Sequence, residues 1–249
     1  MEKKSSLNKW YLIPILVLGI NFLFRLIDQS KLVKIFPLDL VNDYSGHMAM
    51  LYFLKVCGFH EICPFWYNGY TTFLSYTPGW SFFAFPLYLV TNNILLTTFL
   101  SLVVLFLVGF VLIYFFGKRH ELSTLSTVLF FLFVFANAMS IGNFIRLGRL
   151  TEFFAWIVFI PLFFLSLEYK DKKIDKFFAI NFLIFYSMLM ISHPLVTIQA
   201  HIMLLGFILV KNNKERLKLI ALALIGLVIS SFWWFTYLKQ LNNNSILDY

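Results

Sequence analysis

Long apolar stretches without a charged residue alternate along this chain with short segments that hold most of the charge. Three of the uncharged stretches are residues 122–145, 177–210 and 219–238. A helix needs about 20 mostly apolar residues to cross the hydrocarbon core of a bilayer. The pattern therefore predicts an all-α integral membrane protein.

Seven helical spans account for the apolar pattern. The stretch 177–210 is too long for one helix and has lysine-rich flanks, so we divide it at Ser192-His193-Pro194, where proline breaks a helix. Residues 79–91, rich in Trp, Phe and Pro, are interpreted as an interfacial or re-entrant helix. The expected spans are residues 10–27, 92–116, 122–140, 152–168, 177–192, 195–210 and 219–238.

Composition agrees with this interpretation. Hydrophobic residues make up 60% of the chain and its mean hydropathy is +0.81, which excludes a soluble domain. The net charge of +8 does not indicate nucleic acid, because the basic residues lie at the ends of spans, where they meet anionic lipid. The expected partner is therefore the lipid bilayer.

The distribution of Lys and Arg predicts the orientation of the spans. Thirteen of the 20 basic residues fall at the amino terminus and in the alternate loops around 118–119, 170–176 and 211–218. Such loops stay in the cytoplasm. We therefore expect residues 1–249 to form one multi-pass module in the cell membrane, with a cytoplasmic N-terminus, an extracytoplasmic C-terminus and a large first extracytoplasmic loop, 28–91, that contains short helices.

An acidic residue and a histidine occur together in this first loop. Asn42, Asp43 or Ser45 can cap a helix that ends near Gly58, and on such a helix Asp43 and His47 share a face. A carboxylate with an imidazole can act as a base or supply two metal ligands. Spacing alone favours the simpler interpretation of a helix cap and a surface histidine.

Aromatic residues and both cysteines of the chain lie in the same loop. Trp66 and Tyr76 belong to aromatic segments that could stack on a sugar ring or a lipid chain, or lie at headgroup level. Cys57 and Cys63 are expected to form a disulfide, which persists outside the cytoplasm. With His60 between them they could instead offer three zinc ligands, but no fourth is evident.

Three further polar residues are expected on the same side of the membrane. Arg146 and Arg149 are basic residues on the side of the membrane that is expected to carry few of them. This position suggests a phosphate partner, because a guanidinium pairs with phosphate through two hydrogen bonds. The alternatives are lipid headgroups or an ion pair with Glu152. His193, in the turn of the 177–210 hairpin, is either a polar turn residue or part of a site.

Taken together, these elements resemble the GT-C superfamily of polytopic membrane glycosyltransferases. More narrowly, they look like the archaeal and bacterial membrane proteins labelled "6-pyruvoyl-tetrahydropterin synthase-related". The resemblance covers nearly the whole chain through short motifs in the same order. The matching residues are Asp43, His47, Gly58, Pro64, Trp66, Gly69, Tyr76, Pro78, Gly148, Arg149, Leu150, Glu152, Ala155, Pro161, His193 and Trp233.

The resemblance implies transfer of a sugar from a polyprenyl-phosphate donor to an acceptor on the extracytoplasmic face. It implies that Asp43, with His47, is the acidic catalytic residue of the first loop, which deprotonates the acceptor hydroxyl or helps to hold a divalent cation such as Mg or Mn. The lipid phosphate would then meet Arg149 and Arg146. The remaining candidates for substrate binding are Trp66, Tyr76 and His193.

The chain departs from larger members of this superfamily at its end. It stops at Tyr249, just after the seventh expected span, whereas larger relatives continue with further spans and often a soluble domain. We therefore expect a missing C-terminal region or a partner subunit. The alternative function is a non-catalytic membrane subunit or a scaffold that binds polyprenyl phosphate without turnover.

Overall fold

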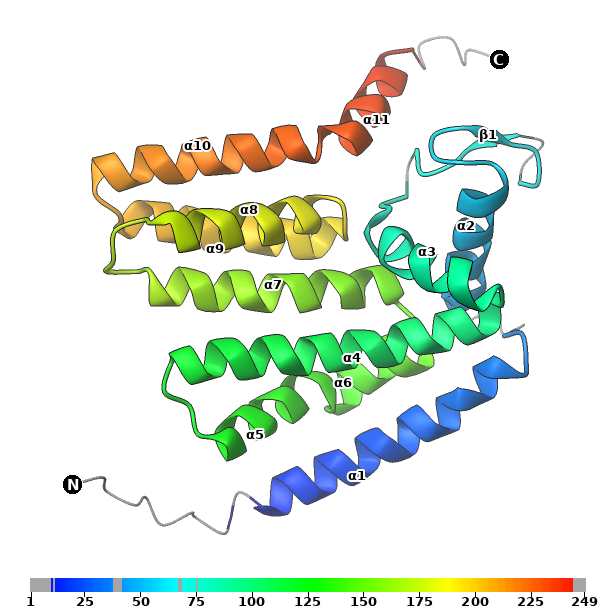
Figure 1. The fold of residues 1–249 in the computed structure, drawn as a ribbon, viewed down its shortest axis with the longest axis horizontal. Coiled ribbons are helices and arrows are strands. Elements are labelled where there is room, and N and C mark those ends of the chain that lie inside the picture. Colours follow the sequence, from blue (N-terminus) through cyan, green and yellow to red (C-terminus); the bar gives the residue numbers. More distant parts are fainter. Residues whose placement is uncertain (1–9, 11, 38–41, 67–68, 75, 244–249) are drawn as a thin grey trace.

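A computed structural model of the chain describes residue 10 and residues 12–37, 42–66, 69–74 and 76–243. The amino-terminal lysines that contribute to the predicted orientation lie outside these residues, as do residues 244–249. The described part is helical apart from one small hairpin (Figure 1). Its helices are α1 Leu12–Gln29, α2 Tyr44–Val56, α3 Gly79–Thr91, α4 Ile94–Arg119, α5 Thr124–Phe135, α6 Ala138–Ser140, α7 Leu150–Glu168, α8 Lys176–Met190, α9 Pro194–Val210, α10 Asn213–Ile229 and α11 Ser231–Asn243, with a 3-10 turn Ser30–Val33 after α1 and a π-helix Ile141–Arg146 after α6.

Three of these helices are long and apolar enough to cross a membrane, by length and composition. They are α1 with its 3-10 extension (Leu12–Val33), α4 and α7. A fourth span exists if the pair Thr124–Phe135 and Ala138–Arg146, bent by 52°, is counted as one. Helices α3, α8 and α9 are apolar but shorter. These helices support a multi-pass helical membrane protein.

Two of the predicted spans are broken. In 122–140 the break comes at Asn137, whose side chain accepts a hydrogen bond from Ser140 N at 3.0 Å and donates to the carbonyl oxygens of Phe133 and Val134. In 219–238 it comes at Ser230, whose hydroxyl donates to Gly226 O. Asn and Ser side chains that bond to nearby backbone compete with the helical hydrogen bonds.

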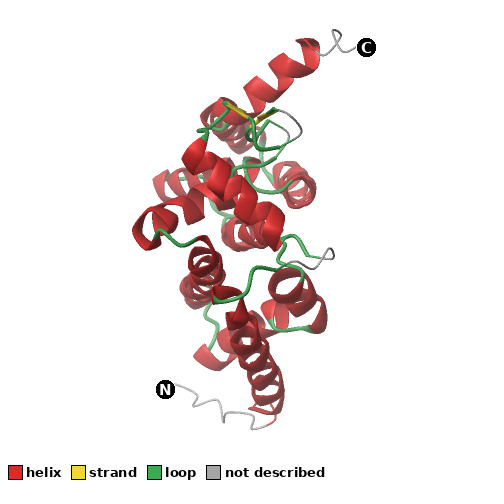
Figure 2. Cartoon of the chain, turned by 90° about the vertical axis from the view of Figure 1, so that its right-hand side faces the viewer, coloured by secondary structure: helices red, strands yellow, loops and turns green. Residues whose placement is uncertain are grey.

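The helices form a layered bundle with two different ends (Figure 1). At one end lie the basic connections between α4 and α5, between α7 and α8, and between α9 and α10; we call this the basic-loop end. At the other end lie α2, α3 and the hairpin. Figure 2 views the molecule from this second end, along most of the long helices.

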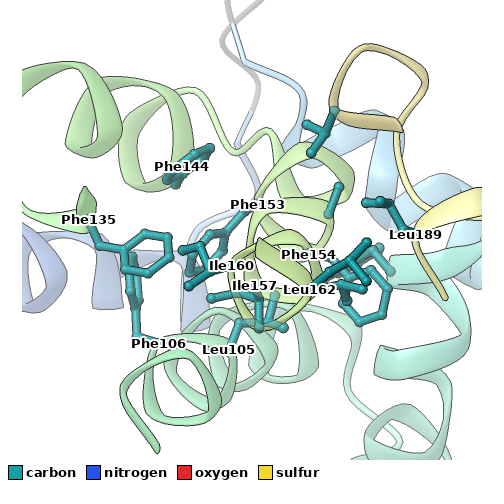
Figure 3. Close-up of a cluster of buried hydrophobic side chains, with 14 of the residues drawn as sticks. Leu105, Phe106, Phe135, Phe144, Phe153, Phe154, Ile157, Ile160, Leu162 and Leu189 are labelled. Carbon is teal, nitrogen blue, oxygen red and sulfur yellow. The ribbon is translucent and has the colours of Figure 1, made fainter. Parts of the chain in front are cut away.

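Helix α7 forms the middle of the core. Phe153 on α7 packs against Phe106 of α4 and Phe144 of the π-helix, with ring centroids 4.4 and 4.9 Å apart (Figure 3). Gly109 of α4 lets α7 approach closely, because a Cβ there would lie 2.4 Å from Ile157 Cδ1. The first residues of α7 are therefore held firmly.

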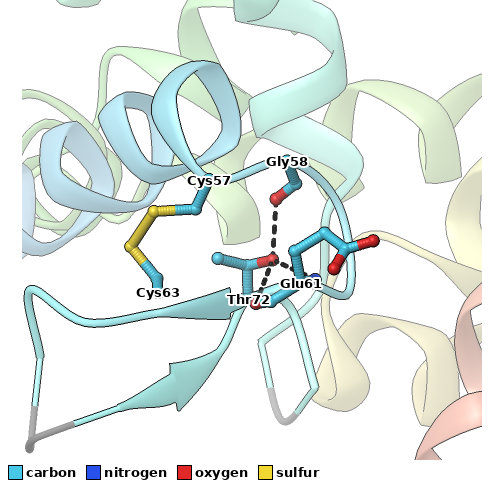
Figure 4. The surroundings of a disulfide bond; sticks show 5 residues. All are labelled: Cys57, Gly58, Glu61, Cys63 and Thr72. Atoms are coloured by element: carbon cyan, nitrogen blue, oxygen red, sulfur yellow. Dashed lines mark hydrogen bonds between the residues drawn. A yellow bond between two sulfur atoms is a disulfide. The ribbon is translucent and has the colours of Figure 1, made fainter.

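The hairpin is a small departure from the all-helical prediction. Strands β1 (Ile62–Cys63) and β2 (Tyr70–Thr71) pair antiparallel. The predicted disulfide between Cys57 and Cys63 is present, with Cα atoms 5.4 Å apart, and ties the end of α2 to β1. Thr72 Oγ1 also donates to Gly58 O at 2.7 Å (Figure 4).

Candidate functional site

A cavity of about 340 Å³ opens at the end of the bundle opposite the basic loops. We call it the Asp43 cavity. Four segments distant in sequence line it: the start of α2, the approach to α3, the start of α7 and the turn between α8 and α9. Its lining residues are Asp43, His47, Tyr76, Thr77, Arg149, Thr151, Glu152, His193, Pro194 and Leu195.

The start of α2 is docked onto the turn before α7. Asp43 N donates to Leu147 O at 2.7 Å, and the Tyr44 hydroxyl donates to Ile145 O at 2.7 Å. Gly148 has a φ of +69°, and a Cβ there would lie 2.4 Å from the Tyr44 ring. Only glycine meets both conditions without strain. This contact places Asp43 and Arg149 on the same cavity wall.

A second glycine joins α3 to the turn between α8 and α9. Gly79 N donates to Ile191 O at 2.8 Å, and a Cβ on Gly79 would lie 2.9 Å from that same oxygen. The backbones of the two segments therefore touch. This contact brings Tyr76 and Thr77 to the same cavity as His193.

Asp43 precedes the first residue of α2, but its carboxylate does not cap the helix. The side chain of Asn42 accepts the hydrogen bond from Tyr44 N instead, at 3.1 Å. Asp43 is exposed and lines the cavity. The simpler interpretation of Asp43 as a helix cap therefore does not describe its side chain.

His47 is buried rather than on the surface, with 4% of the residue exposed. Its ring lies against Trp80 and Tyr76, with centroid distances of 5.4 and 6.3 Å. Burial, followed by the charge of His193, lowers the pKa of His47 to about 4. The imidazole is therefore neutral at neutral pH and borders the cavity as a hydrogen-bonding group without charge.

Arg149, Glu152 and His193 form the most polar wall of the cavity. Arg149 Nη1 lies 3.6 Å from Glu152 Oε2, a loose ion pair that leaves the arginine side chain 46% exposed. Burial lowers the pKa of His193, Glu152 opposes this shift and Arg149 adds to it. His193 Nδ1 is buried and has no hydrogen-bond partner among the described residues. A bound ligand could satisfy this atom.

Tyr76 completes the cavity beside Asp43. Burial raises the pKa of its hydroxyl, and the charge of Asp43 raises it further. The phenol therefore stays protonated and can donate a hydrogen bond. Its exposed ring can also lie against a sugar face.

The other two residues expected to bind substrate lie elsewhere. Arg146 lines a separate cavity at the end of α1. Trp66 packs against Phe53, with centroids 5.8 Å apart, and is not among the lining residues of the Asp43 cavity. The Asp43 cavity thus contains Asp43, His47, Tyr76, Arg149 and His193 of the predicted set.

Glu152 and two threonines line the cavity without having been predicted as site residues. Glu152 was expected only as an alternative ion-pair partner of Arg149, yet its position three residues later on a helix start already implied a shared face. Thr77 and Thr151 have no distinguishing sequence pattern. Their hydroxyls add hydrogen-bonding capacity to the cavity.

The donor groups of the cavity do not form a complete metal site. Within the described ranges, no group of three or more His, Cys, Asp or Glu side chains is placed to hold a metal ion. Asp43 and His47 line the cavity as a pair only, and we derive no step through Mg or Mn. Zinc at Cys57 and Cys63 does not fit, because both sulfurs are in the disulfide.

Comparison of the chain with protein-family models, with curated proteins and with solved structures finds no match. The site is therefore interpreted from its own geometry.

Proposed function

We propose that this protein is a membrane glycosyltransferase that transfers a sugar from a polyprenyl-phosphate donor to an acceptor on the extracytoplasmic face. The observation that carries the proposal is the meeting of Asp43 and Arg149 in one cavity. Such a transfer requires a base near the acceptor hydroxyl and positive charge at the leaving phosphate. The cavity supplies one group of each kind.

The proposed membrane arrangement has seven spans: α1, α4, the bent α5–π-helix unit, α7, α8, α9 and α10. The basic connections gather at one end of the bundle, and α2 and α3 lie at the other (Figure 1). The start of α2 and the approach to α3 line the Asp43 cavity, which therefore lies at this second end. By the distribution of positive charge, the basic-loop end is cytoplasmic. The cavity then faces outward at membrane level, where a lipid-linked substrate can enter sideways.

In the proposed reaction, the guanidinium of Arg149 pairs with the phosphate of the donor. Asp43 accepts the proton of the acceptor hydroxyl while the oxygen of that hydroxyl attacks the anomeric carbon of the sugar. The bond between this carbon and the phosphate oxygen breaks, and the leaving polyprenyl phosphate takes the electron pair. Arg149 stabilises the charge that develops on the leaving group.

The neutral residues of the cavity orient the substrates. His193 and Tyr76 can hydrogen-bond to sugar hydroxyls, because neither carries charge at neutral pH. His47 borders the same space in its neutral form. Their contribution is to position the acceptor and the sugar relative to Asp43.

The first test uses Arg149→Lys, which keeps the charge and removes the planar fork. The purified protein in vesicles is given a panel of undecaprenyl-phosphate sugars together with a cell-envelope extract as the source of acceptor hydroxyls, and release of undecaprenyl phosphate is measured. We expect Arg149→Lys to weaken lipid-phosphate binding by about tenfold, the loss of about 1.4 kcal/mol. The matched variant Arg216→Lys, at the basic-loop end, should behave like the wild type.

Equal binding and turnover in Arg149→Lys and the wild type would contradict the phosphate role of Arg149. A different outcome would identify the chain as a scaffold. In that case the wild type binds the lipid and the Arg149 variant does not, but the wild type releases no product.

A further inference from the structure

A second cavity, of about 410 Å³, lies on the other side of the segment that holds Asp43. We call it the Arg146 cavity. Asn42 and Tyr44 line it, whereas Asp43 between them lines the Asp43 cavity. Arg146 and Arg149 are divided between the two cavities in the same way. The two cavities are therefore back to back and have separate sets of basic residues.

The Arg146 cavity has excess positive charge. Among the described residues, Arg25, Lys31 and Arg146 line it with a single acidic residue, Asp28. Asp28 lies 3.5 Å from Lys31, so this pair is approximately neutral. In the described ranges, neither Arg25 nor Arg146 has a carboxylate within ion-pair distance. Two guanidinium groups from different elements are thus left to meet an anion.

A buried amide adds a second indication of a ligand. Gln29 is 7% exposed, lines the Arg146 cavity and makes no hydrogen bond through its side chain to the described residues. The buried side-chain atoms without a partner in the described ranges are His60 Nε2 and His193 Nδ1, so the Gln29 amide is open to the cavity, where water or a ligand can satisfy it. An anion bound by the two arginines would accept a hydrogen bond from this amide.

The surroundings of the Arg146 cavity suit a lipid. The exposed Ile35 and Phe36 line the cavity and offer apolar contacts for an acyl chain. The exposed apolar side chains of α1, such as Ile20, Leu23 and Ile27, lie on the opposite face of that helix from Arg25 and Gln29 and do not line the cavity. A phosphate in the cavity is therefore compatible with acyl chains that contact Ile35 and Phe36.

We propose that the Arg146 cavity binds a phosphate group, held by Arg25, Arg146 and Gln29, and that this phosphate belongs to an anionic membrane phospholipid. Arginine suits phosphate because its planar fork donates two parallel hydrogen bonds. This site is separate from the cavity proposed for sugar transfer, and it does not require the chain to be an enzyme.

The test compares the wild type with the double variant Arg25→Gln/Arg146→Gln. Native mass spectrometry measures retention of phosphatidylglycerol against phosphatidylcholine by detergent-purified protein. We expect one tightly held phosphatidylglycerol in the wild type and at least about tenfold weaker retention in the double variant. The control Lys173→Gln/Lys176→Gln loses the same charge at the basic-loop end and should keep this lipid. Thermal unfolding checks folding, and Arg146→Lys serves as a milder variant, expected to weaken retention less.

A second arm uses inorganic phosphate with delipidated protein. One result is that phosphate stabilises the wild type where phosphatidylglycerol does not, and that this effect is lost in the Arg25 and Arg146 variants. That result would identify free phosphate, and not a phospholipid, as the ligand and would still support the site. The proposal is overturned if the folded variants retain phosphatidylglycerol and respond to phosphate as the wild type does.

Discussion

The carboxylate of Asp43 and the imidazole of His47 border one cavity in different environments. Asp43 is exposed, while His47 is buried against Trp80 and Tyr76. The two residues are four apart in sequence, a spacing that brings side chains to one face of a helix, and both line the Asp43 cavity. The burial of His47 could not be predicted, because it depends on α3 packing over the start of α2.

The burial of His47 makes stability depend on pH. Its pKa is about 4 in the folded protein and 6.5 when unperturbed, so the unfolded state binds the proton more tightly. Stability is therefore full above pH 6.5 and falls as the pH drops from 6.5 to 4, by about 3 kcal/mol. Thermal unfolding across this range should show a steeper loss in the wild type than in His47→Gln.

The control for this prediction is Gln199→Asn, an exposed amide on α9 that does not titrate, and its unfolding should keep the pH dependence of the wild type. A His47→Gln variant with the same pH dependence as the wild type would contradict the assignment of a buried neutral imidazole.

At the scale of elements, the π-helix Ile141–Arg146 and the turn after it decide which arginine reaches which cavity. A π-helix is rare and often occurs at functional sites. Residues 146 and 149 would lie on one face of a continuous α-helix. The chain instead leaves the helix at Leu147 and turns at Gly148, so the two arginines separate.

The Gly148→Ala substitution tests this junction. The new Cβ would meet the Tyr44 ring and would stand on a residue with positive φ, which together cost about 3 kcal/mol. We expect a clear fall in the midpoint of thermal unfolding. Gly142→Ala lies within the π-helix and has nothing within 4 Å of the new Cβ, so it should change stability by less than about 1 kcal/mol.

Similar unfolding midpoints for the two glycine variants would show that the contact between Tyr44 and Gly148 does not hold the cavity together.

The apolar pattern predicted most helices close to where they occur. The division of 177–210 at Pro194 and the short helix over 79–91 match α8, α9 and α3. The breaks at Asn137 and Ser230 were not predicted, because each depends on one side chain bonding to the backbone of an otherwise apolar run. Periodicity describes which faces are apolar and is insensitive to such local competition.

At the scale of the whole molecule, the predicted side of the membrane for each loop indicated which residues could meet. Asp43, Tyr76, Arg149 and His193 come from separate segments and line one cavity. Trp66 was predicted to join them, but the hairpin packs it onto α2. The predicted side of each loop limits which residues can lie at the same end of the bundle. Whether they line one cavity depends on close contacts between segments, such as those at Gly79 and Gly148.

Topology is tested with single cysteines at Lys31 and Lys172 in a background without native cysteines. Their side chains are 58% and 60% exposed, so both sites are open to a reagent. If the basic loops are cytoplasmic, an impermeant thiol reagent should label Lys31→Cys and not Lys172→Cys in intact cells. The reverse labelling would invert the proposed orientation.

The most direct test of the proposed function is the turnover of Asp43→Asn. This change keeps the shape of the side chain and removes its charge, so it should abolish release of undecaprenyl phosphate while lipid binding stays near that of the wild type. Asp171→Asn, an exposed aspartate at the basic-loop end, is the matched control and should keep full turnover. An Asp43→Asn protein that turns over as fast as an active wild type would contradict the role of Asp43 as the base.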